Sequence, residues 1–275
     1  MTAVDAPGTS DFAAATRLVA DGPGRWRADI HDGWDVAGVP NGGYLLAIVG
    51  GALVDDAQRP DPVSVTAHYV APAVPGEATV TTEVLRRGRR LVTMRAEVAQ
   101  QGRPLAHVLA TMGDLTDGAD SPSLPFRPPA LPPPEQCLGA GEVPEATFTP
   151  AVFTKTEMRI HPAHGGFAVG RPHGTAELAG WVRFPDGHPL DSRAMLFVAD
   201  AFPPPIFNAA FPVSWVPTIA LTVHLHKRPK AGWIGARFHS EHVAGGYLEE
   251  DGVMWDGDGD LVAVSRQLAL LPRGA

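Results

Sequence analysis

Asp200 is the residue whose setting in the sequence points most directly to chemistry. It is the only charged side chain in the stretch AMLFVADAFPPPIF, residues 194–207, and no basic residue adjoins it. Burying a carboxylate without a partner is costly, and desolvation raises its pKa. A carboxylate with a raised pKa is what a general base needs near neutral pH. The alternative is a structural aspartate that ends a helix and caps the turn before the prolines, and the stretch alone supports both readings.

Several groups of histidines and acidic residues look like metal ligands, but each set is incomplete. Three short motifs hold two histidines each: His224 and His226, His161 and His164, and His239 and His242. No cysteine or acidic residue completes a tetrahedral site at a recognisable spacing. The run DGDGD, residues 256–260, begins like a calcium loop, but Leu261 stands where that loop needs glycine and Gln267 stands at its twelfth position. We therefore expect no bound metal, and we interpret DGDGD as a hairpin turn.

The run GVPNGGYLLAIVGGALVDD, residues 38–56, raises the question whether its glycines bind a nucleotide. A phosphate loop needs lysine and then serine or threonine after its last glycine, and no lysine follows Gly42 or Gly43. A dinucleotide-binding motif needs a hydrophobic strand directly before the glycines, and the preceding HDGWDVA is not one. We therefore expect no cofactor here, and we interpret the run as a helix whose small residues allow close approach of another backbone.

Composition limits the classes of protein to which the chain can belong. Of its 275 residues 44% are apolar and 19% are charged, as in ordinary globular proteins, and the net charge of −8 argues against a nucleic-acid binder. The single cysteine, Cys137, excludes an internal disulfide and fits a reducing compartment. The first residues lack the basic and apolar regions of a signal peptide, and no apolar run is long enough for a membrane span. We expect a cytoplasmic protein with no membrane span.

A proline-rich segment divides the chain into two halves that repeat one series of elements. Each half has a strand, an apolar helix (residues 42–54 and 190–202) and then several strands with alternating apolar residues. Matching positions are nearly equally spaced: Pro72 and Pro229 lie 157 residues apart, Gly88 and Gly245 also 157, and Leu105 and Leu261 156. The sequence thus predicts an internal duplication, with an N-terminal unit (residues 1–115), an extended polyproline-like linker (116–145) and a C-terminal unit (146–275).

The fold predicted from this duplication is α+β. One long helix cannot cover itself, whereas a curved antiparallel sheet can wrap around it, so each unit is expected to be a helix wrapped by such a sheet. The helix starts, Gly42 and Asp191, are only 149 residues apart, so the second unit has about 7 to 8 additional residues between its helix and its next strand. We expect the two sheets to pair into one continuous sheet about a pseudo-two-fold axis.

The order and spacing of these elements resemble those of a known family. Together with the stretches GGYLLAIVGGAL, SVTAHYVAP, VPTIALTVHLHKRP and DGDGDLVAVSRQLAL, they make the chain similar to the TesB-like (type II) acyl-CoA thioesterases, which have a tandem, or double, HotDog fold. The resemblance covers about residues 20–115 and 145–272. It implies hydrolysis of fatty or related acyl-CoA to free acid and coenzyme A, without a nucleophilic serine.

The resemblance also implies which residues form the active site. It matches Asp200, Thr218 and Gln267 to the family's three residues around the hydrolytic water, with Asp200 as the base and the other two holding the water. By analogy, a backbone N–H of Gly42 or Gly43 at the start of the first helix would bind the oxyanion. The chain departs from the family pattern at residues 203–205 and in the insert HPAHGGFAVGRPHG, residues 161–174, which would both shape the acyl tunnel.

Basic residues of two predicted hairpins are candidates for contacts with the phosphates of coenzyme A. These residues are Arg89, Arg90, Lys227 and Arg228, and their alternative role is that of solvated surface charge. Acyl-CoA is thus the expected partner, with no nucleic acid. Exposed sheet edges also leave open a homo-oligomer, either a dimer or a higher assembly.

Two other functions remain open at this point. A non-catalytic acyl-CoA-binding HotDog protein would keep the fold without turnover. A HotDog enoyl-CoA hydratase usually joins an aspartate to a histidine five residues later on one helix, and no histidine follows Asp200 there. The hydratase is therefore the weaker alternative.

Overall fold

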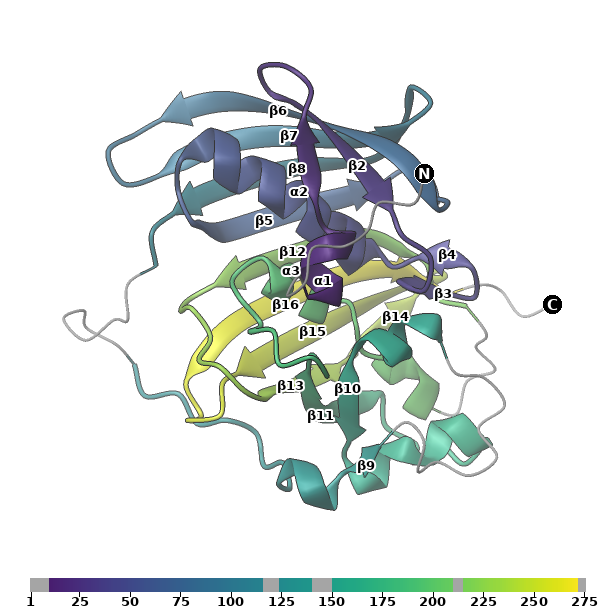
Figure 1. The fold of residues 1–275 in the computed structure, drawn as a ribbon. Coiled ribbons are helices and arrows are strands. Elements are labelled where there is room, and N and C mark those ends of the chain that lie inside the picture. The colour runs from purple at the N-terminus through teal and green to yellow at the C-terminus, as the bar shows by residue number, and fades with distance from the viewer. Residues whose placement is uncertain (1–9, 116–123, 140–149, 210–214, 272–275) are drawn as a thin grey trace.

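The computed structural model describes residues 10–115, 124–139, 150–209 and 215–271. Fourteen strands of these residues form one continuous sheet, and its paired strands are antiparallel. The sheet is not closed into a barrel, and its two halves curve around the helices α2 and α3 at the centre of the molecule (Figure 1). The expected architecture, two helix-wrapped antiparallel sheets that pair into one, is confirmed.

The first half of the chain supplies one long helix and most of one half of the sheet. Its elements are α1 (Asp11–Ala15), β1 (Leu18–Ala20), β2 (Arg25–Ile30), β3 (Asp35–Val36), β4 (Val39–Pro40), α2 (Gly42–Ala57), β5 (Asp61–Tyr69), β6 (Gly76–Arg87), β7 (Val92–Gln100) and β8 (Arg103–Gly113). The predicted alternation along β7 is confirmed, because Met94 and Ala96 are buried while Arg95 between them is exposed.

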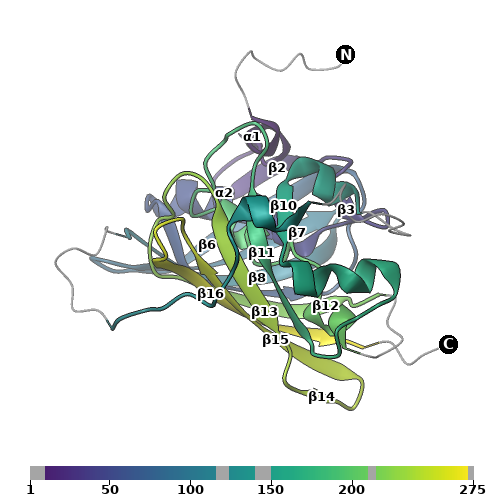
Figure 2. The ribbon, with the colours of Figure 1, turned by 90° about the horizontal axis from the view of Figure 1, so that it is seen from below.

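The second half contains shorter helices and the other half of the sheet. Its elements are η1 (Pro134–Gln136), β9 (Leu138–Gly139), η3 (Ala151–Lys155), β10 (Glu157–Ile160), η4 (Pro162–Val169), β11 (Glu177–Arg183), α3 (Ala194–Val198), η5 (Pro205–Asn208), β12 (Thr218–Leu225), β13 (Ile234–His239), β14 (Val243–Ala244), β15 (Tyr247–Trp255) and β16 (Leu261–Leu270), where η marks a 3₁₀ helix. The predicted DGDGD turn joins β15 to β16, and the β14–β15 hairpin extends from the sheet (Figure 2).

The strand order shows the duplication directly. From the centre outward it reads β5-β8-β7-β6-β2 in one half and β12-β16-β15-β13-β11 in the other, so the halves repeat one topology. They meet where β5 pairs with β12, with Thr66 opposite Thr222 and their hydroxyl oxygens 3.0 Å apart. Because Thr66 and Thr222 are 156 residues apart, the spacing found in the sequence places them as equivalent residues at the pseudo-two-fold axis.

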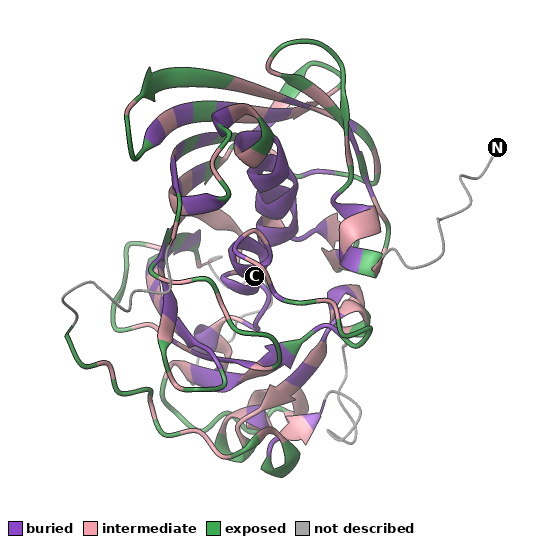
Figure 3. Ribbon diagram, turned by 60° about the vertical axis from the view of Figure 1, so that its left-hand side comes forward, coloured by how far each residue is buried: buried purple, intermediate pink, exposed green. Residues whose placement is uncertain are grey.

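The two central helices differ in length. α2 has 16 residues and is buried through nearly its whole length (Figure 3), as its apolar composition on all sides requires. The second helix, expected over residues 190–202, is shorter, since α3 spans only Ala194–Val198. Asp191 caps its start by accepting a hydrogen bond from the Ala194 N–H, and three consecutive prolines at residues 203–205 prevent its continuation.

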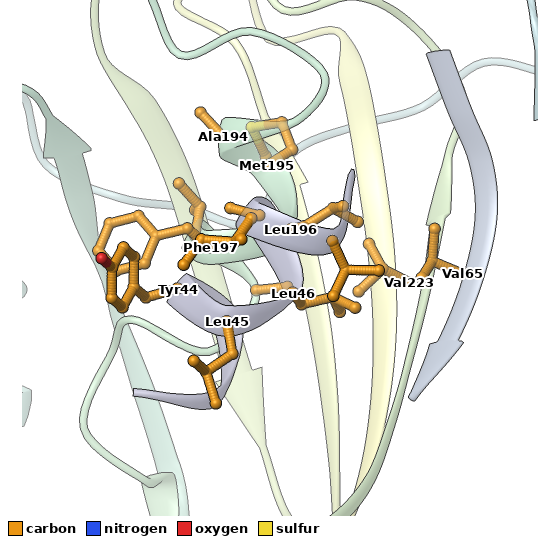
Figure 4. Close-up of a cluster of buried hydrophobic side chains, with 14 of the residues drawn as sticks. Tyr44, Leu45, Leu46, Val65, Ala194, Met195, Leu196, Phe197 and Val223 are labelled. Carbon is orange, nitrogen blue, oxygen red and sulfur yellow. The ribbon is translucent and has the colours of Figure 1, made fainter. Parts of the chain in front are cut away.

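α2 and α3 pack on each other and on the two central strands. Leu45 and Leu46 of α2 and Leu196 and Phe197 of α3 belong to one buried cluster with side chains of β5 and β12 (Figure 4). The core is therefore shared between the two halves of the chain.

The expected linker is only partly within the described residues, because residues 116–123 and 140–145 lie outside them. The described part, residues 124–139, is more structured than a polyproline-like connector. It contains η1 and the edge strand β9, which pairs with β10, and its Pro132 carbonyl accepts a hydrogen bond from Trp181 Nε1 (2.7 Å). This segment therefore packs against the second half of the sheet. None of the helices in the described residues is both long and apolar enough to span a bilayer.

Candidate active site

Asp200 lies where the end of one central helix meets the start of the other. It follows α3 by two residues, and its Oδ2 accepts hydrogen bonds from the Gly43 N–H (2.8 Å) and from Asn41 Nδ2 (3.1 Å). Asn41 Nδ2 also donates to the Asp200 backbone carbonyl (2.8 Å). The carboxylate thus bonds to the N-terminus of α2, which favours negative charge. These hydrogen bonds do not support the alternative of a cap on the proline turn.

Glycine at the start of α2 makes this contact sterically feasible. A Cβ on Gly43 would lie 2.8 Å from the Phe197 carbonyl oxygen, 2.9 Å from that of Leu196 and 2.8 Å from Asp200 Cβ. Asn41 caps the helix, because its Oδ1 accepts a hydrogen bond from the Tyr44 N–H (2.9 Å). The interpretation of these glycines as packing residues is therefore confirmed.

The surroundings of Asp200 raise the pKa of its carboxyl. Desolvation by the surrounding protein is the main cause, and it outweighs the stabilisation of the charge by Gly43, Thr218, Asn41 and Gly42, so the pKa lies at about 6. Such a carboxyl is ionised at neutral pH yet basic enough to accept a proton.

Thr218 and Gln267 reach the same place from neighbouring strands. Thr218 begins β12, where the pairing with β16 is interrupted by a register shift, and its side chain is close enough to Asp200 to lower the pKa of that carboxyl. Gln267 lies on the inner face of β16 and is 5% exposed, and its Oε1 has no hydrogen-bond partner among the described residues. The structure thus brings together the three residues that the resemblance singled out.

All three residues line one cavity of about 690 Å³ between the two units. Its walls are mostly apolar, and none of its described lining residues is Lys, Arg or His. The two segments that depart from the family pattern both contribute, with Phe167 from the insert and Pro203 and Pro204 from the proline run.

Two further residues at the cavity were not identified from the sequence. Tyr69, at the end of β5, donates its hydroxyl to the Gly42 carbonyl oxygen (2.8 Å), and burial together with nearby Asp200 raises the pKa of this phenol. Glu250 lies on β15 directly opposite Gln267 and is 8% exposed. A usable signal for Glu250 was its alternation with Leu248, Gly252 and Met254, which places it on the buried face of the strand.

The expected oxyanion donors have another partner in this structure. The Gly43 N–H donates to Asp200 (2.8 Å), and the Gly42 backbone also favours the charge of that carboxylate. The start of α2 therefore holds the carboxylate, and the Gly43 N–H is not free for an oxyanion while it does so.

The basic residues proposed for coenzyme A lie away from this cavity. Arg89 and Arg90 follow β6. The Arg89 carbonyl accepts a hydrogen bond from the side chain of Arg59, which lies just beyond the C-terminal end of α2, and Gly43 is at the other end of that helix. Lys227 pairs with Asp256 and Asp260, and Arg228 pairs with Asp61 and Asp114. None of the four lines the cavity, so the structure does not bring them to Asp200.

The histidine motifs likewise form no metal site among the described residues, since no three His, Cys, Asp or Glu side chains there are grouped to hold an ion. The rings of His161, His164 and His173 do lie next to one another, with centroids 4.6 and 4.8 Å apart and tilted planes, but their Nδ1 atoms accept hydrogen bonds from backbone N–H groups.

Comparison with known proteins gives the same picture from both halves of the chain. Residues 30–113 match the model of the acyl-CoA thioesterase N-terminal domain, and residues 134–271 match that of the C-terminal domain. An uncharacterized protein of Mycobacterium tuberculosis is 26% identical over 94% of this chain and 97% of its own length.

Two solved structures are similar over nearly the whole chain. A protein of Thermobifida fusca that carries the provisional description thioesterase II superimposes with a TM-score of 0.88 at 29% identity, covering 97% of this chain and 99% of its own. A hot dog-fold protein of unknown function from Alicyclobacillus acidocaldarius gives a TM-score of 0.83 at 21% identity, covering 97% and 100%.

Proposed function

Because the chain belongs to the acyl-CoA thioesterase family, with a double HotDog fold, we propose that it hydrolyses acyl-CoA to a free acid and coenzyme A. The observation that carries this proposal is the position of Asp200. Its carboxyl, with a pKa of about 6, faces an apolar cavity next to the Thr218 hydroxyl and the Gln267 amide. The described residues that line this cavity include no Lys, Arg or His. This combination can activate a water molecule beside a bound thioester.

In the proposed mechanism Asp200 acts as general base. Its carboxylate takes a proton from a water molecule whose oxygen attacks the thioester carbonyl carbon. The tetrahedral intermediate then collapses, the carbon–sulfur bond breaks, and the leaving thiolate of coenzyme A receives the proton from Asp200. Thr218 and Gln267 hold the water, and the Asn41 amide and Gly43 N–H hold the base in place. We assign Gly43 to this second role rather than to the oxyanion.

The shape of the cavity supports an acyl group as the part of the substrate that it binds. A volume of about 690 Å³ with mostly apolar walls suits a hydrocarbon chain, since burial of apolar surface contributes about 25 cal/mol per Å². Phe167, Pro203 and Pro204 line this space and are therefore the residues proposed to set the preferred acyl length.

The test measures thiol release from short-, medium- and long-chain acyl-CoA substrates with a thiol reagent. Asp200→Asn keeps the shape of the side chain but removes the base, so turnover should fall by roughly 10²–10⁴-fold. Thr218→Ala and Gln267→Ala should each lower it less, since the remaining partner still holds the water. Asp258→Asn, in the exposed β15–β16 turn, is the matched control and should leave turnover unchanged.

The variants also need a check on folding. Asp200→Asn should unfold at no lower temperature than the parent at pH 7.5, because ionising a carboxyl whose folded pKa is raised costs stability as the pH rises through about 6. Binding of acyl-CoA without turnover of any chain length would instead show a non-catalytic acyl-CoA-binding protein. Full activity of Asp200→Asn would overturn the mechanism.

A further inference from the structure

Glu250 is a second buried carboxyl in the cavity that the mechanism above leaves without a role. Its side chain is 8% exposed and lines the same cavity as Asp200, Thr218 and Gln267. Neither a hydrogen bond nor an ion pair is formed with its carboxyl oxygens by the side chains of the described residues. A buried carboxyl without such a contact is costly, so its presence at this position calls for an explanation.

The two carboxyls of the cavity have opposite surroundings. Asp200 receives hydrogen bonds from Gly43 and Asn41, and Thr218 also favours its negative charge, whereas no side chain of the described residues donates to Glu250. An ionised carboxyl disfavours ionisation of a second one in the same apolar cavity, and the described lining residues include no Lys, Arg or His to offset this effect. The charge therefore resides on Asp200 and the proton on Glu250, in agreement with the raised pKa of Glu250, which burial and the nearby Asp200 charge both cause.

The other titratable groups near Glu250 do not change this conclusion. Tyr69, Asp200 and Glu250 itself are the titratable side chains among the described lining residues, and Tyr69 stays neutral. Asp251 follows on the same strand but points to the opposite face, where Arg266 donates to it (2.7 Å). His239 of β13 pairs in register with Asp251 and shares that outer face.

The side-chain oxygen of Gln267 lacks a hydrogen-bond donor, and a neutral Glu250 can supply one. Glu250 and Gln267 are directly opposite on β15 and β16, and both side chains point into the cavity. Side chains in such cross-strand pairs have Cβ atoms about 4.5–5.5 Å apart, within reach of each other. Gln267 Oε1 is buried and lacks a donor, and a protonated carboxyl has one O–H to donate.

We propose that Glu250 in its neutral form donates a hydrogen bond to Gln267 Oε1 and thereby turns the Gln267 Nε2–H₂ group toward the reactive water. An ionised Glu250 would do the opposite, because it would accept from Nε2 and turn the oxygen outward. The proton on Glu250 thus selects which end of the amide meets the water. Glu250 is a positioning residue in this proposal, which rests on the hydrolytic function proposed above.

The first test compares two substitutions that differ in one property. Glu250→Gln keeps a neutral hydrogen-bond donor, so kcat should stay within a few-fold of the parent. Glu250→Met fills the space without a donor, so kcat should fall about tenfold, by no more than in Gln267→Ala, with little change in KM. Glu249→Gln, on the adjacent position of the strand, is the matched control. Equal activity of Glu250→Met and the parent, or equal loss in both variants, would overturn the proposal.

The pH profile separates positioning from a merely structural role. In the parent, kcat should fall at alkaline pH as Glu250 ionises, and this fall should be absent in Glu250→Gln. The acid limb, set by Asp200 near pH 6, should lie at the same pH in the parent and in Glu250→Gln, because a neutral Glu250 does not repel the charge of Asp200. A shift of that limb to lower pH in Glu250→Gln would show that Glu250 is ionised in the parent, contrary to the proposal.

A measurement without turnover keeps this inference separate from the proposed function. The carboxyl carbon of Glu250 can be followed by NMR in protein labelled with ¹³C-glutamate, with Glu250→Gln to assign its signal. A protonated signal at pH 7 supports the inference, and an ionised one overturns it, whether or not acyl-CoA is hydrolysed. Absence of thiol release by the parent would count only against the proposed function.

Discussion

At the scale of single residues, the proposed site depends on one carboxylate whose surroundings raise its pKa into the range of a general base. The Gly43 N–H, the Asn41 amide and the Thr218 hydroxyl favour its charge, while desolvation opposes it more strongly. The balance leaves the pKa of Asp200 at about 6, so a modest change in pH decides whether the base is free.

This balance predicts the acid limb of the activity profile. Below about pH 6 Asp200 is protonated and cannot accept a proton from water, so kcat/KM should fall about tenfold per pH unit there and level off above pH 7. Asn41→Ala removes a hydrogen bond that favours the charged form, so its acid limb should move to higher pH. Measurement of kcat/KM from pH 4.5 to 8.5 tests both points. A limb that stays in place in Asn41→Ala would contradict this account.

At the scale of elements, the proposed active site is formed because α2 and α3 approach closely. The contact places the α2 N-terminus, from the first half of the chain, against the aspartate that follows α3 in the second half. Gly43 lies at this crossing, where a side chain would meet backbone carbonyl oxygens that cannot move independently.

Gly43→Ala should therefore separate the helices and damage the site. We expect a loss of about 1–3 kcal/mol in the free energy of unfolding and a marked loss of kcat, because the Gly43 N–H moves away from Asp200. Gly51→Ala is the matched control on the same helix. Its Cβ would lie 3.0 Å from Leu18 Cδ1, the end of a flexible side chain, so stability should change by less than about 1 kcal/mol. Denaturant unfolding and thiol release measure both, and equal effects would contradict this interpretation.

At the scale of the whole molecule, the two units share one sheet and one core. The β5–β12 pair continues the sheet from one unit to the other, and a single cluster of buried side chains includes residues of both. Trp34 in the first unit and Trp255 in the second are both almost fully buried. Neither half can be removed without exposing a central strand and the face of a buried helix.

The protein should consequently unfold in one cooperative transition. Met94→Ala in β7 and Met254→Ala in β15 each create a cavity in a different unit and should each cost about 2–5 kcal/mol. Both should lower the midpoint of the same calorimetric peak without splitting it. Two separate peaks, or a substitution that shifts only part of the transition, would show that the two units unfold independently.

The sequence by itself determined the repeated architecture and the most informative residue of the site. Alternation and spacing can be read along the chain without knowledge of the fold. The near-constant offset of 156 to 157 residues therefore revealed the duplication, and the lone charge in residues 194–207 revealed Asp200. The sequence predicted a second helix longer than α3, because the apolar run continues after α3 has ended. Thr218 and Gln267 came only from family resemblance, since neither stands out in its own strand.

Only the tertiary structure decided what surrounds these residues. The bond from Gly43 to Asp200 joins positions 157 residues apart, and it follows from the packing of two helices rather than from any local pattern. The same packing revealed Tyr69 and Glu250 at the cavity and placed the basic hairpin residues away from it. Desolvation and charge coupling depend on distances in space, so the pKa of Asp200 and the contrasting state of Glu250 could be obtained only after the fold was known.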